Sequence, residues 1–303
     1  MSCRTGSPTS MAEVGAAHPG QGGRLDVELV RRGLARARGQ AEELLRAGRV
    51  QVDGRPAAKA SMKVGAASDL VVVPADQPDY VGRGALKLAG VLDDLAFAGD
   101  APQVMGRRCL DAGASTGGFT QVLLERGAQR VIAVDVGHGQ LAALLLADPR
   151  VIDRPGTTVR GLAPEQVGGQ VDLLVADLSF ISVAVVLADL VALVRPGGDL
   201  LVLVKPQFEV GRERLGSGGV VRDMARRVEA VESVARAALD VHGLAVRAVR
   251  ASRWPGPSGN VEYFQWLTRP GAADPAGVGP APAGIGADEL GHEVRRVVRQ
   301  GPQ

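Results

Sequence analysis

The chain has 303 residues, of which 46% are hydrophobic, 3% are aromatic and 22% are charged, and its formal net charge is +2. This length and composition allow a full core and suggest about two domains of ordinary size. Two cysteines far apart in the sequence exclude a disulfide framework and a CxxC metal pair, and no apolar run approaches the length of a membrane span.

Residues 1–23 are rich in Gly, Ser, Pro and Ala without periodicity, and we expect them to form a disordered tail. They contain no apolar segment of the kind that a secretory signal requires, so we expect a cytoplasmic protein without a membrane partner. The following segment is basic, because residues 24–65 contain ten Lys and Arg against five Asp and Glu. This excess suggests a polyanionic partner, although a solvated helix face would also explain it.

The basic segment is predicted to fold into two short helices and a strand. Leu25 to Val30 and residues 37–47 have helical apolar spacing, and residues 50–54, VQVDG, indicate a strand that enters a tight turn. The stretch resembles the small RNA-binding domain named after ribosomal protein S4, over residues 24–73. This resemblance implies that guanidinium groups pair with phosphates and stack on bases. The candidate RNA-binding residues are Arg24, Arg31, Arg32, Arg36, Arg38 and Arg49.

An α/β domain is expected after a Pro/Asp-rich linker over residues 74–82. A helix should begin near Arg83, and apolar runs typical of buried strands then alternate with helical patterns. The expected strands cover residues 108–111, 130–135, 150–152, 171–176 and 200–204, and the expected helices cover residues 119–126, 139–147, 181–194 and 222–242. This alternation predicts a parallel sheet with helices on both faces.

The end of this domain indicates which kind of α/β sheet it contains. The apolar runs at residues 244–252 and 261–267 have only WPGPSGN between their strand cores, so they should pair antiparallel at one edge of the sheet. This ending fits a Rossmann-like, seven-stranded methyltransferase sheet better than a six-stranded dinucleotide fold. We expect the domain to span residues 83–269, followed over residues 270–303 by a Pro/Gly/Ala-rich linker and a short C-terminal helix.

The stretch LDAGASTGGF, residues 110–119, predicts a nucleotide-binding turn between a strand and its helix. Ser115 stands where a dinucleotide loop needs glycine, and the stretch instead resembles the first motif of S-adenosylmethionine-dependent methyltransferases. Asp135 ends the next strand, where a carboxylate can accept hydrogen bonds from both ribose hydroxyls. The candidate cofactor-binding residues are Asp111, Gly113, Ala114, Ser115, Thr116, Gly117, Gly118, Phe119, Asp135 and Asp177.

Four ionisable residues stand at strand ends or loop edges: Lys87, Asp177, Lys205 and Glu262. A lysine directly after a buried run costs desolvation free energy unless it is paired or functional, and a purely structural ion pair between Lys205 and Asp177 is one explanation. The order Lys, Asp, Lys, Glu resembles the catalytic tetrad of FtsJ-like RNA 2′-O-methyltransferases. This resemblance implies that Lys205 activates a ribose hydroxyl, that Asp177 positions it, and that the other two complete the network.

The whole arrangement resembles the TlyA family. An S4-like domain ahead of an FtsJ-like domain, with DAGASTGGFT, VADLSFIS, LVKPQFEVG and GPSGNVEYF, is similar to that family over about residues 24–267. The resemblance implies methylation of cytidine 2′-hydroxyls in ribosomal RNA of the large subunit and, in some members, also the small one. The family's linker and third-strand loop differ here, as PDYV at residues 78–81 and PGTT at residues 155–158. A membrane-active haemolysin and a non-catalytic RNA-binding factor are the alternatives.

Overall fold

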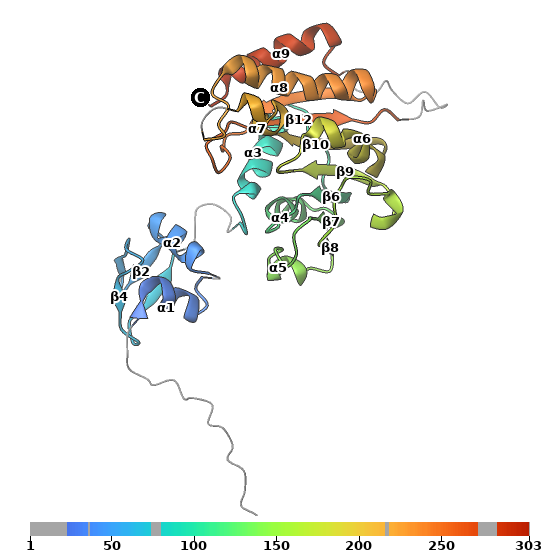
Figure 1. Ribbon diagram of the computed structural model, residues 1–303. Helices are drawn as coiled ribbons and strands as arrows, with labels where there is room; N and C mark the ends of the chain where they lie inside the picture. The colour runs from blue at the N-terminus through green and yellow to red at the C-terminus, as the bar shows by residue number, and fades with distance from the viewer. Residues whose placement is uncertain (1–22, 36, 74–79, 216–217, 272–283, 303) are drawn as a thin grey trace, which may run out of the picture. The chain divides into compact units, whose positions relative to one another are not determined.

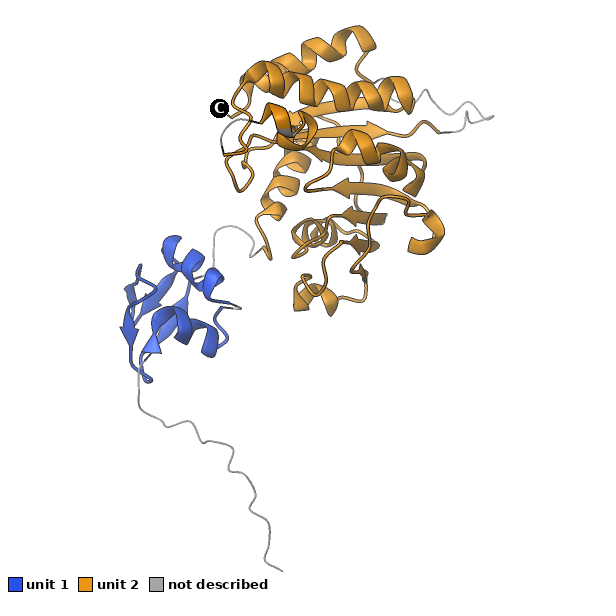
Figure 2. Cartoon of the chain, viewed as in Figure 1, with its two compact units in different colours: residues 1–79 blue, residues 80–303 orange. Residues whose placement is uncertain are grey.

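The computed structural model describes residues 23–35, 37–73, 80–215, 218–271 and 284–302. The chain divides into two compact units, residues 1–79 and 80–303 (Figure 2). Several expected features lie outside the described residues: nearly all of the N-terminal tail, Arg36, residues 74–79 of the expected linker, and residues 272–283 of the Pro/Gly/Ala-rich segment.

The first unit packs two helices against short antiparallel strands. Leucines at helical spacing face inward from both helices, and the burial of these side chains stabilises the small core. The helices are α1 (Leu25–Arg31) and α2 (Arg38–Arg46), and the strands are β1 (Gly23–Arg24), β2 (Val50–Val52), β3 (Arg55–Pro56), β4 (Lys63–Val64) and β5 (Leu70–Val72). Strand β2 pairs with β3 and β5, and β1 pairs with β4.

The second unit is built on a seven-stranded sheet with the order β11-β12-β10-β9-β6-β7-β8 (Figure 1). Strand β12 runs antiparallel to both of its neighbours, β10 and β11, and the other pairs are parallel. The strands are β6 (Arg108–Ala112), β7 (Arg130–Val134), β8 (Val151–Arg154), β9 (Val171–Ala176), β10 (Val194–Val204), β11 (Ala245–Ala251) and β12 (Tyr263–Thr268). The predicted methyltransferase-type sheet with an antiparallel ending is confirmed.

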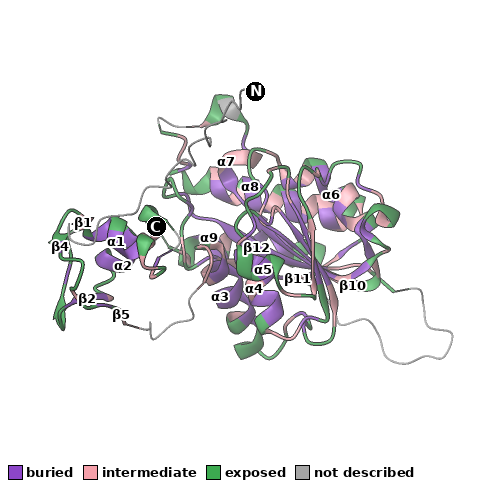
Figure 3. Cartoon of the chain, turned by 90° about the horizontal axis from the view of Figure 1, so that it is seen from below, coloured by how far each residue is buried: buried purple, intermediate pink, exposed green. Residues whose placement is uncertain are grey.

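Helices cover both faces of this sheet. They are α3 (Gly84–Phe97), α4 (Gly118–Glu125), α5 (Ala143–Leu146), α6 (Val183–Leu193), α7 (Pro206–Glu209), α8 (Met224–Arg236) and α9 (Ala287–Gln300). Alternate strand residues face the two layers, so Leu201 packs with α3 and α4 whereas Leu200 packs with α6, α8 and α9. The strands form a buried layer between them (Figure 3). In the described part of the chain, no helix is long and apolar enough to cross a membrane.

Helix α9 lies along α8 and also contacts β11 (Figure 1). Its apolar stripe, which includes Leu290, Val294 and Val298, is buried in the same core as β9 and β10. The polar residues between them remain on the outer side of the helix. The C-terminal helix expected from the sequence is therefore an integral part of the second unit.

Two expected elements differ in extent. The helix expected over residues 139–147 is reduced to α5, because the preceding segment turns around Asp135, whose Oδ1 accepts a hydrogen bond from the N–H of Gly137 at 2.7 Å. The strand expected to start at residue 200 begins at Val194. Its register with β9 shifts between Val194 and Asp199, a stretch in which Pro196 supplies no N–H to the ladder.

Candidate active site

Three polar side chains follow neighbouring parallel strands of the second unit. Asp135 follows β7, Asp177 follows β9 and Lys205 follows β10. Strand β6 lies between β7 and β9 and leads into the loop of residues 113–117. All four segments therefore stand at the carboxyl ends of the strands, the edge at which open α/β sheets bind their ligands.

The loop of residues 113–117 is held by close backbone packing. Gly113 has a φ of 85°, in the region that favours glycine, and a Cβ atom there would lie 2.6 Å from the carbonyl oxygen of Asp177. A Cβ atom on Gly118 would lie 2.8 Å from the backbone nitrogen of Ala85. These glycines let the loop contact both the end of β9 and the start of α3. Their predicted contact with a cofactor stays a prediction.

Asp135 presents an oriented carboxylate to a small hollow. Its Oδ2 accepts a hydrogen bond from the N–H of Ser115 at 2.8 Å, and its Oδ1 accepts the bond from Gly137. Each oxygen retains a further acceptor direction, which suits two ribose hydroxyls. Gln140 also lines this hollow, and its Oε1 accepts a hydrogen bond from Oγ of Ser115 at 3.1 Å. Gln140 was not predicted from the sequence, because it belongs to none of the recognised motifs.

Asp111 lies beneath the loop. Its side chain is fully buried, and its Oδ2 accepts a hydrogen bond from Oγ1 of Thr120 at 2.7 Å. Burial raises the pKa of Asp111 to about 7, Thr120 opposes this rise, and the carboxylates of Asp177 and Asp135 add to it. Asp111 therefore joins the end of β6 to the first turn of α4. Its predicted contact with a cofactor stays a prediction.

The four ionisable residues form two ion pairs. Nζ of Lys87, on α3, donates to Oε2 of Glu262 at 2.6 Å, and the two side chains are 7% and 1% exposed. Nζ of Lys205 lies 2.6 Å from Oδ1 of Asp177. Both lysines are buried. A buried ammonium group needs such a partner, because unpaired it would lose its hydration without compensation.

The first turn of α3 brings these groups near the loop. A Cβ atom on Gly84 would lie 3.8 Å from Oδ2 of Asp177 and 3.6 Å from the ring of Phe119. Lys87 follows Gly84 by three residues, which is about one turn of the same helix. Asp177 and the predicted donor loop therefore meet at the start of α3, one helical turn before Lys87.

Three residues around Lys205 were not predicted. Nζ of Lys205 donates to Oγ of Ser179 at 2.9 Å and lies 5.8 Å from the centre of the Phe208 ring. The rings of Phe180 and Phe208 have centres 5.4 Å apart, and Phe180 is exposed. All three lie within VADLSFIS and LVKPQFEVG. The motifs were therefore recognisable, but residue types alone could not predict that an aromatic side chain would face solvent beside the lysine.

In the first unit, predicted RNA-binding arginines surround two buried carboxylates. Arg24 and Arg38 both contact Asp26, and hydrogen bonds from Arg24 above all lower the pKa of this carboxyl group. In the same way, Arg31 and Arg32 both contact Glu28.

Two of the predicted arginines are also bound to backbone carbonyl groups. Arg32 donates to the carbonyls of Gly65, Ala66 and Ser68, and Arg49 donates to that of Val73. These bonds join helix and strand regions of the first unit. Arg32 and Arg49 therefore have structural contacts in addition to their predicted role.

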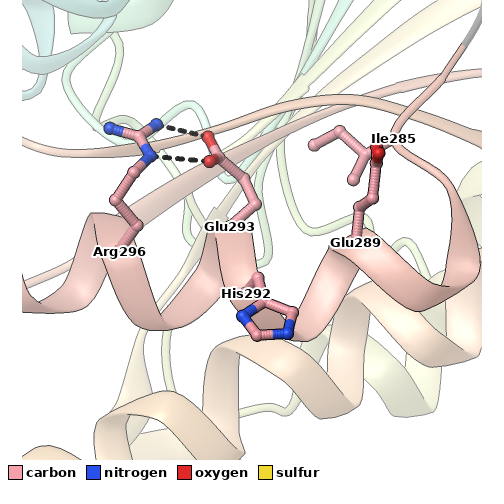
Figure 4. A pocket seen from close by; sticks show the side chains of 5 residues that line it. All are labelled: Ile285, Glu289, His292, Glu293 and Arg296. Carbon is pink, nitrogen blue, oxygen red and sulfur yellow. Dashed lines mark hydrogen bonds and ion pairs between the residues drawn. The ribbon is translucent and has the colours of Figure 1, made fainter.

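A separate hollow lies on α9 in the second unit. It is lined by Ile285, Glu289, His292, Glu293 and Arg296, and the last two form an ion pair (Figure 4). None of the four paired lysine, aspartate and glutamate residues lines this hollow. It is not part of the candidate active site.

Comparisons with known proteins agree with this geometry. Residues 80–269 match the FtsJ-like methyltransferase family, and residues 23–71 match the S4 domain. The chain is 56% identical over 244 residues to the 16S/23S rRNA (cytidine-2′-O)-methyltransferase TlyA of Mycobacterium tuberculosis, with 80% of this chain and 89% of the relative covered. The chain belongs to the TlyA family.

Two further proteins show more distant similarity. The 23S rRNA (cytidine-2′-O)-methyltransferase TlyA of Campylobacter jejuni is 34% identical over 193 residues, with 63% of this chain and 71% of the relative covered. A solved structure from Streptococcus thermophilus, which carries a hemolysin name, is 32% identical. That match covers 92% of this chain and 97% of the other, with a TM-score of 0.66. The predicted resemblance to a methyltransferase family that uses S-adenosylmethionine is confirmed.

Proposed function

We propose that this TlyA-family enzyme transfers a methyl group from S-adenosylmethionine to the 2′-hydroxyl of cytidine in ribosomal RNA. The relative from M. tuberculosis has this activity in its name, for both 16S and 23S rRNA. The observation that carries the proposal is the approach of Asp177 both to the proposed donor loop and to the first turn of α3, the helix that carries Lys87. We place the reaction in the cytoplasm, with ribosomal subunits as partners.

Asp135 and the loop of residues 113–118 would hold the methyl donor. The Asp135 carboxylate is fixed by two backbone N–H groups and keeps acceptor capacity for ribose hydroxyls, so it is suited to bind the ribose of the donor. When bound, the donor supplies an electrophilic methyl group on a sulfonium centre. Asp177, whose carbonyl oxygen approaches Gly113, lies between the donor side and Lys205.

Lys205 is the residue that we assign to the acceptor hydroxyl. A ribose hydroxyl is a weak nucleophile and must lose its proton as its oxygen bonds to carbon. Nζ of Lys205 has three N–H directions when charged; one is directed to Ser179, and the Asp177 carboxylate lies beside it. A further direction remains for the 2′-oxygen. A neutral Lys205 amine would accept the hydroxyl proton with its lone pair in this direction, whereas a charged ammonium group would stabilise the oxygen while the proton passes to water.

Exposed basic side chains of the first unit would bind the RNA backbone. The side chains of Arg24, Arg31 and Arg38 are 47%, 61% and 59% exposed although each is ion-paired. Arginine forks can bind a carboxylate and still offer outer N–H groups to a phosphate. Exposed basic residues outside the predicted set are Arg46, Arg55, Lys59 and Lys63.

Lys205→Ala tests the proposal. We expect the variant to bind S-adenosylmethionine with unchanged affinity, because the donor contacts lie at Asp135 and the loop, and to lose methyl transfer to ribosomal particles. Mapping of 2′-O-methyl groups in rRNA after incubation with wild-type or variant enzyme provides the measurement. Full activity of the variant would rule out Lys205 as the activating group. Donor binding by the wild type without any transfer would instead favour a non-catalytic RNA-binding factor.

A further inference from the structure

Helix α7 begins directly after Lys205 and ends in Glu209, whose carboxylate reaches a different element. Oε2 of Glu209 accepts a hydrogen bond from Oγ of Ser182 at 2.5 Å, and Oε1 accepts one from the N–H of Val183 at 2.8 Å. Ser182 is the N-cap residue of α6 and makes no side-chain cap bond of its own. Glu209 therefore caps α6 from outside, at the end where a helix favours negative charge.

The position of Glu209 is not favourable for the charged carboxylate. Burial raises the pKa of Glu209 above its ordinary value, although the hydroxyl of Ser182 and the N–H groups of Val183 and Ala184 act against this rise. A serine at the N-cap could satisfy the same helix end locally, without bringing a carboxylate from another segment. Capping of α6 alone therefore does not explain why a buried carboxylate occupies this position.

The contacts of Glu209 connect two segments that carry the proposed active site. The segment after β9 carries Asp177, Ser179 and Phe180, and the segment after β10 carries Lys205 and Phe208. Across this junction, Lys205 contacts Asp177 and Ser179, and Phe180 contacts Phe208.

The bonds of Glu209 to Ser182 and Val183 provide a third connection between the same segments. Glu209 lies four residues after Lys205, and Ser182 lies two residues after Phe180, so these bonds join the far ends of the two segments. A connection at this place limits sliding of α7 along the segment after β9. The short helix is thereby held at both of its ends.

We propose that Glu209 is a positioning residue, which holds α7 on the start of α6 so that Nζ of Lys205 stays beside Asp177 and Ser179. This inference deepens the proposed function and rests on it, because it assumes that Lys205 acts on the acceptor hydroxyl. Glu209 itself acts through Lys205. Since a displacement of about 1 Å at a reacting group can lower a rate by about 100-fold, loss of this connection should reduce turnover.

Glu209→Gln and Ser182→Ala test the proposal in the full-length protein. Glutamine keeps the size of the side chain but loses its charge and turns one acceptor oxygen into a donor, so the contact with Ser182 persists only if the hydroxyl reverses and accepts a hydrogen bond from the glutamine amide. We expect kcat for rRNA methylation to fall about 10-fold or more, while the Kd for S-adenosylmethionine stays within twofold of the wild-type value. The double variant should be slower than Glu209→Gln alone, because the glutamine amide then has no hydroxyl to contact.

Glu213→Gln is the matched control. Glu213 is exposed, lies four residues further along, and has no hydrogen-bond or ion-pair partner among the residues that the structure describes. It should leave kcat unchanged. A wild-type kcat in the double variant would overturn the proposal. The proposal would also be overturned if the loss of activity were fully explained by weaker donor binding or by a lower fraction of folded protein, measured by thermal unfolding. Either pattern indicates a general structural role.

A spectroscopic measurement separates this inference from the proposed function. The chain has only four lysines, so the side-chain nitrogen signals of a ¹⁵N-lysine sample can be assigned by substitution. We expect Glu209→Gln to shift the Lys205 signal and to leave that of Lys87 in place. An unchanged Lys205 signal would overturn the positioning role. If the wild-type protein transfers no methyl group, the proposed function fails, and this measurement still decides whether Glu209 positions Lys205.

Discussion

Phe180 combines two features that folding alone does not favour. Its side chain is 91% exposed, and its backbone has a φ of 65°, in a region that a bulky residue rarely adopts and that costs on the order of 1–2 kcal/mol. The residue lies next to Ser179, which hydrogen-bonds Lys205, and its ring contacts that of Phe208. An exposed aromatic ring beside the lysine that we propose to act on ribose suits stacking on the base of the same nucleotide.

We expect Phe180→Ala to lower methyl transfer roughly 10- to 100-fold, because base–aromatic stacking contributes about 1–3 kcal/mol per base. Thermal stability should not fall, since the lost side chain buries little area. Phe97→Ala is the control, because Phe97 is 97% exposed at the end of α3 and lies outside the site. Rates should be compared at limiting RNA. Equal rates for the two variants would contradict the role of Phe180.

The paired lysines were predictable, whereas their neighbours were not. Lys205 and Asp177 follow buried apolar runs, and the polarity of a residue at such a strand end is visible in the sequence. Phe180, Gln140 and Glu209 depend on backbone angle, exposure and contacts between distant segments, which residue types alone do not reveal. For the same reason, the sequence could not show that Arg32 would bind three carbonyl groups.

At the scale of elements, Asp111 links a strand to the helix that follows it. The carboxyl group lies at the end of β6 and contacts Thr120 in the first turn of α4. Helical and strand periodicities predicted both elements, because their apolar residues face a core. The same sequence reading predicted a cofactor contact for Asp111 but could not show that its side chain is fully buried, since a motif gives the position of a residue and not the direction of its side chain.

The stability of the protein should depend on pH through Asp111. A pKa that rises from 3.8 to about 7 on folding corresponds to on the order of 4 kcal/mol. This destabilising free energy is absent below pH 3.8, the pKa of Asp111 in the unfolded chain. It grows as the pH rises and reaches its full value above about pH 7. Asp111→Asn has no such ionisation and can still accept from Thr120. Urea unfolding between pH 5 and 8 should therefore show the variant gaining stability relative to the wild type, and parallel profiles would disprove this expectation.

At the scale of the whole molecule, the excess of basic side chains is concentrated in one segment of the first unit. Residues 24–65 carry ten basic against five acidic side chains, and the rest of the chain has a net charge of −3. An attraction to phosphates would therefore come mainly from the first unit and weaken as salt increases. Neighbouring arginines in that unit differ in their contacts, since the Arg31 side chain is 61% exposed and that of Arg32 only 21%.

Arg31→Gln and Arg32→Gln should therefore separate RNA binding from folding. We expect Arg31→Gln to weaken binding of an rRNA fragment and to reduce the slope of log K against log salt by about 1, with a loss of thermal stability limited to its bonds to Glu28. Arg32→Gln should instead destabilise the first unit, because it removes hydrogen bonds from a charged donor to three carbonyl groups. Binding titrations at several salt concentrations and thermal unfolding provide the measurements. Identical behaviour of the two variants would refute this division.

The burial of α9 has a consequence for biosynthesis. Strand β12 is made after β11 yet lies between β11 and β10, and α9 is made after both and still supplies Leu290 and Val294 to their shared core. The first unit has its core residues within residues 25–72 and can fold while the second is being translated. The methyltransferase unit can complete its core only after residues 287–300 have left the ribosome. A nascent chain therefore has no finished active-site scaffold with which to modify the ribosome that is making it.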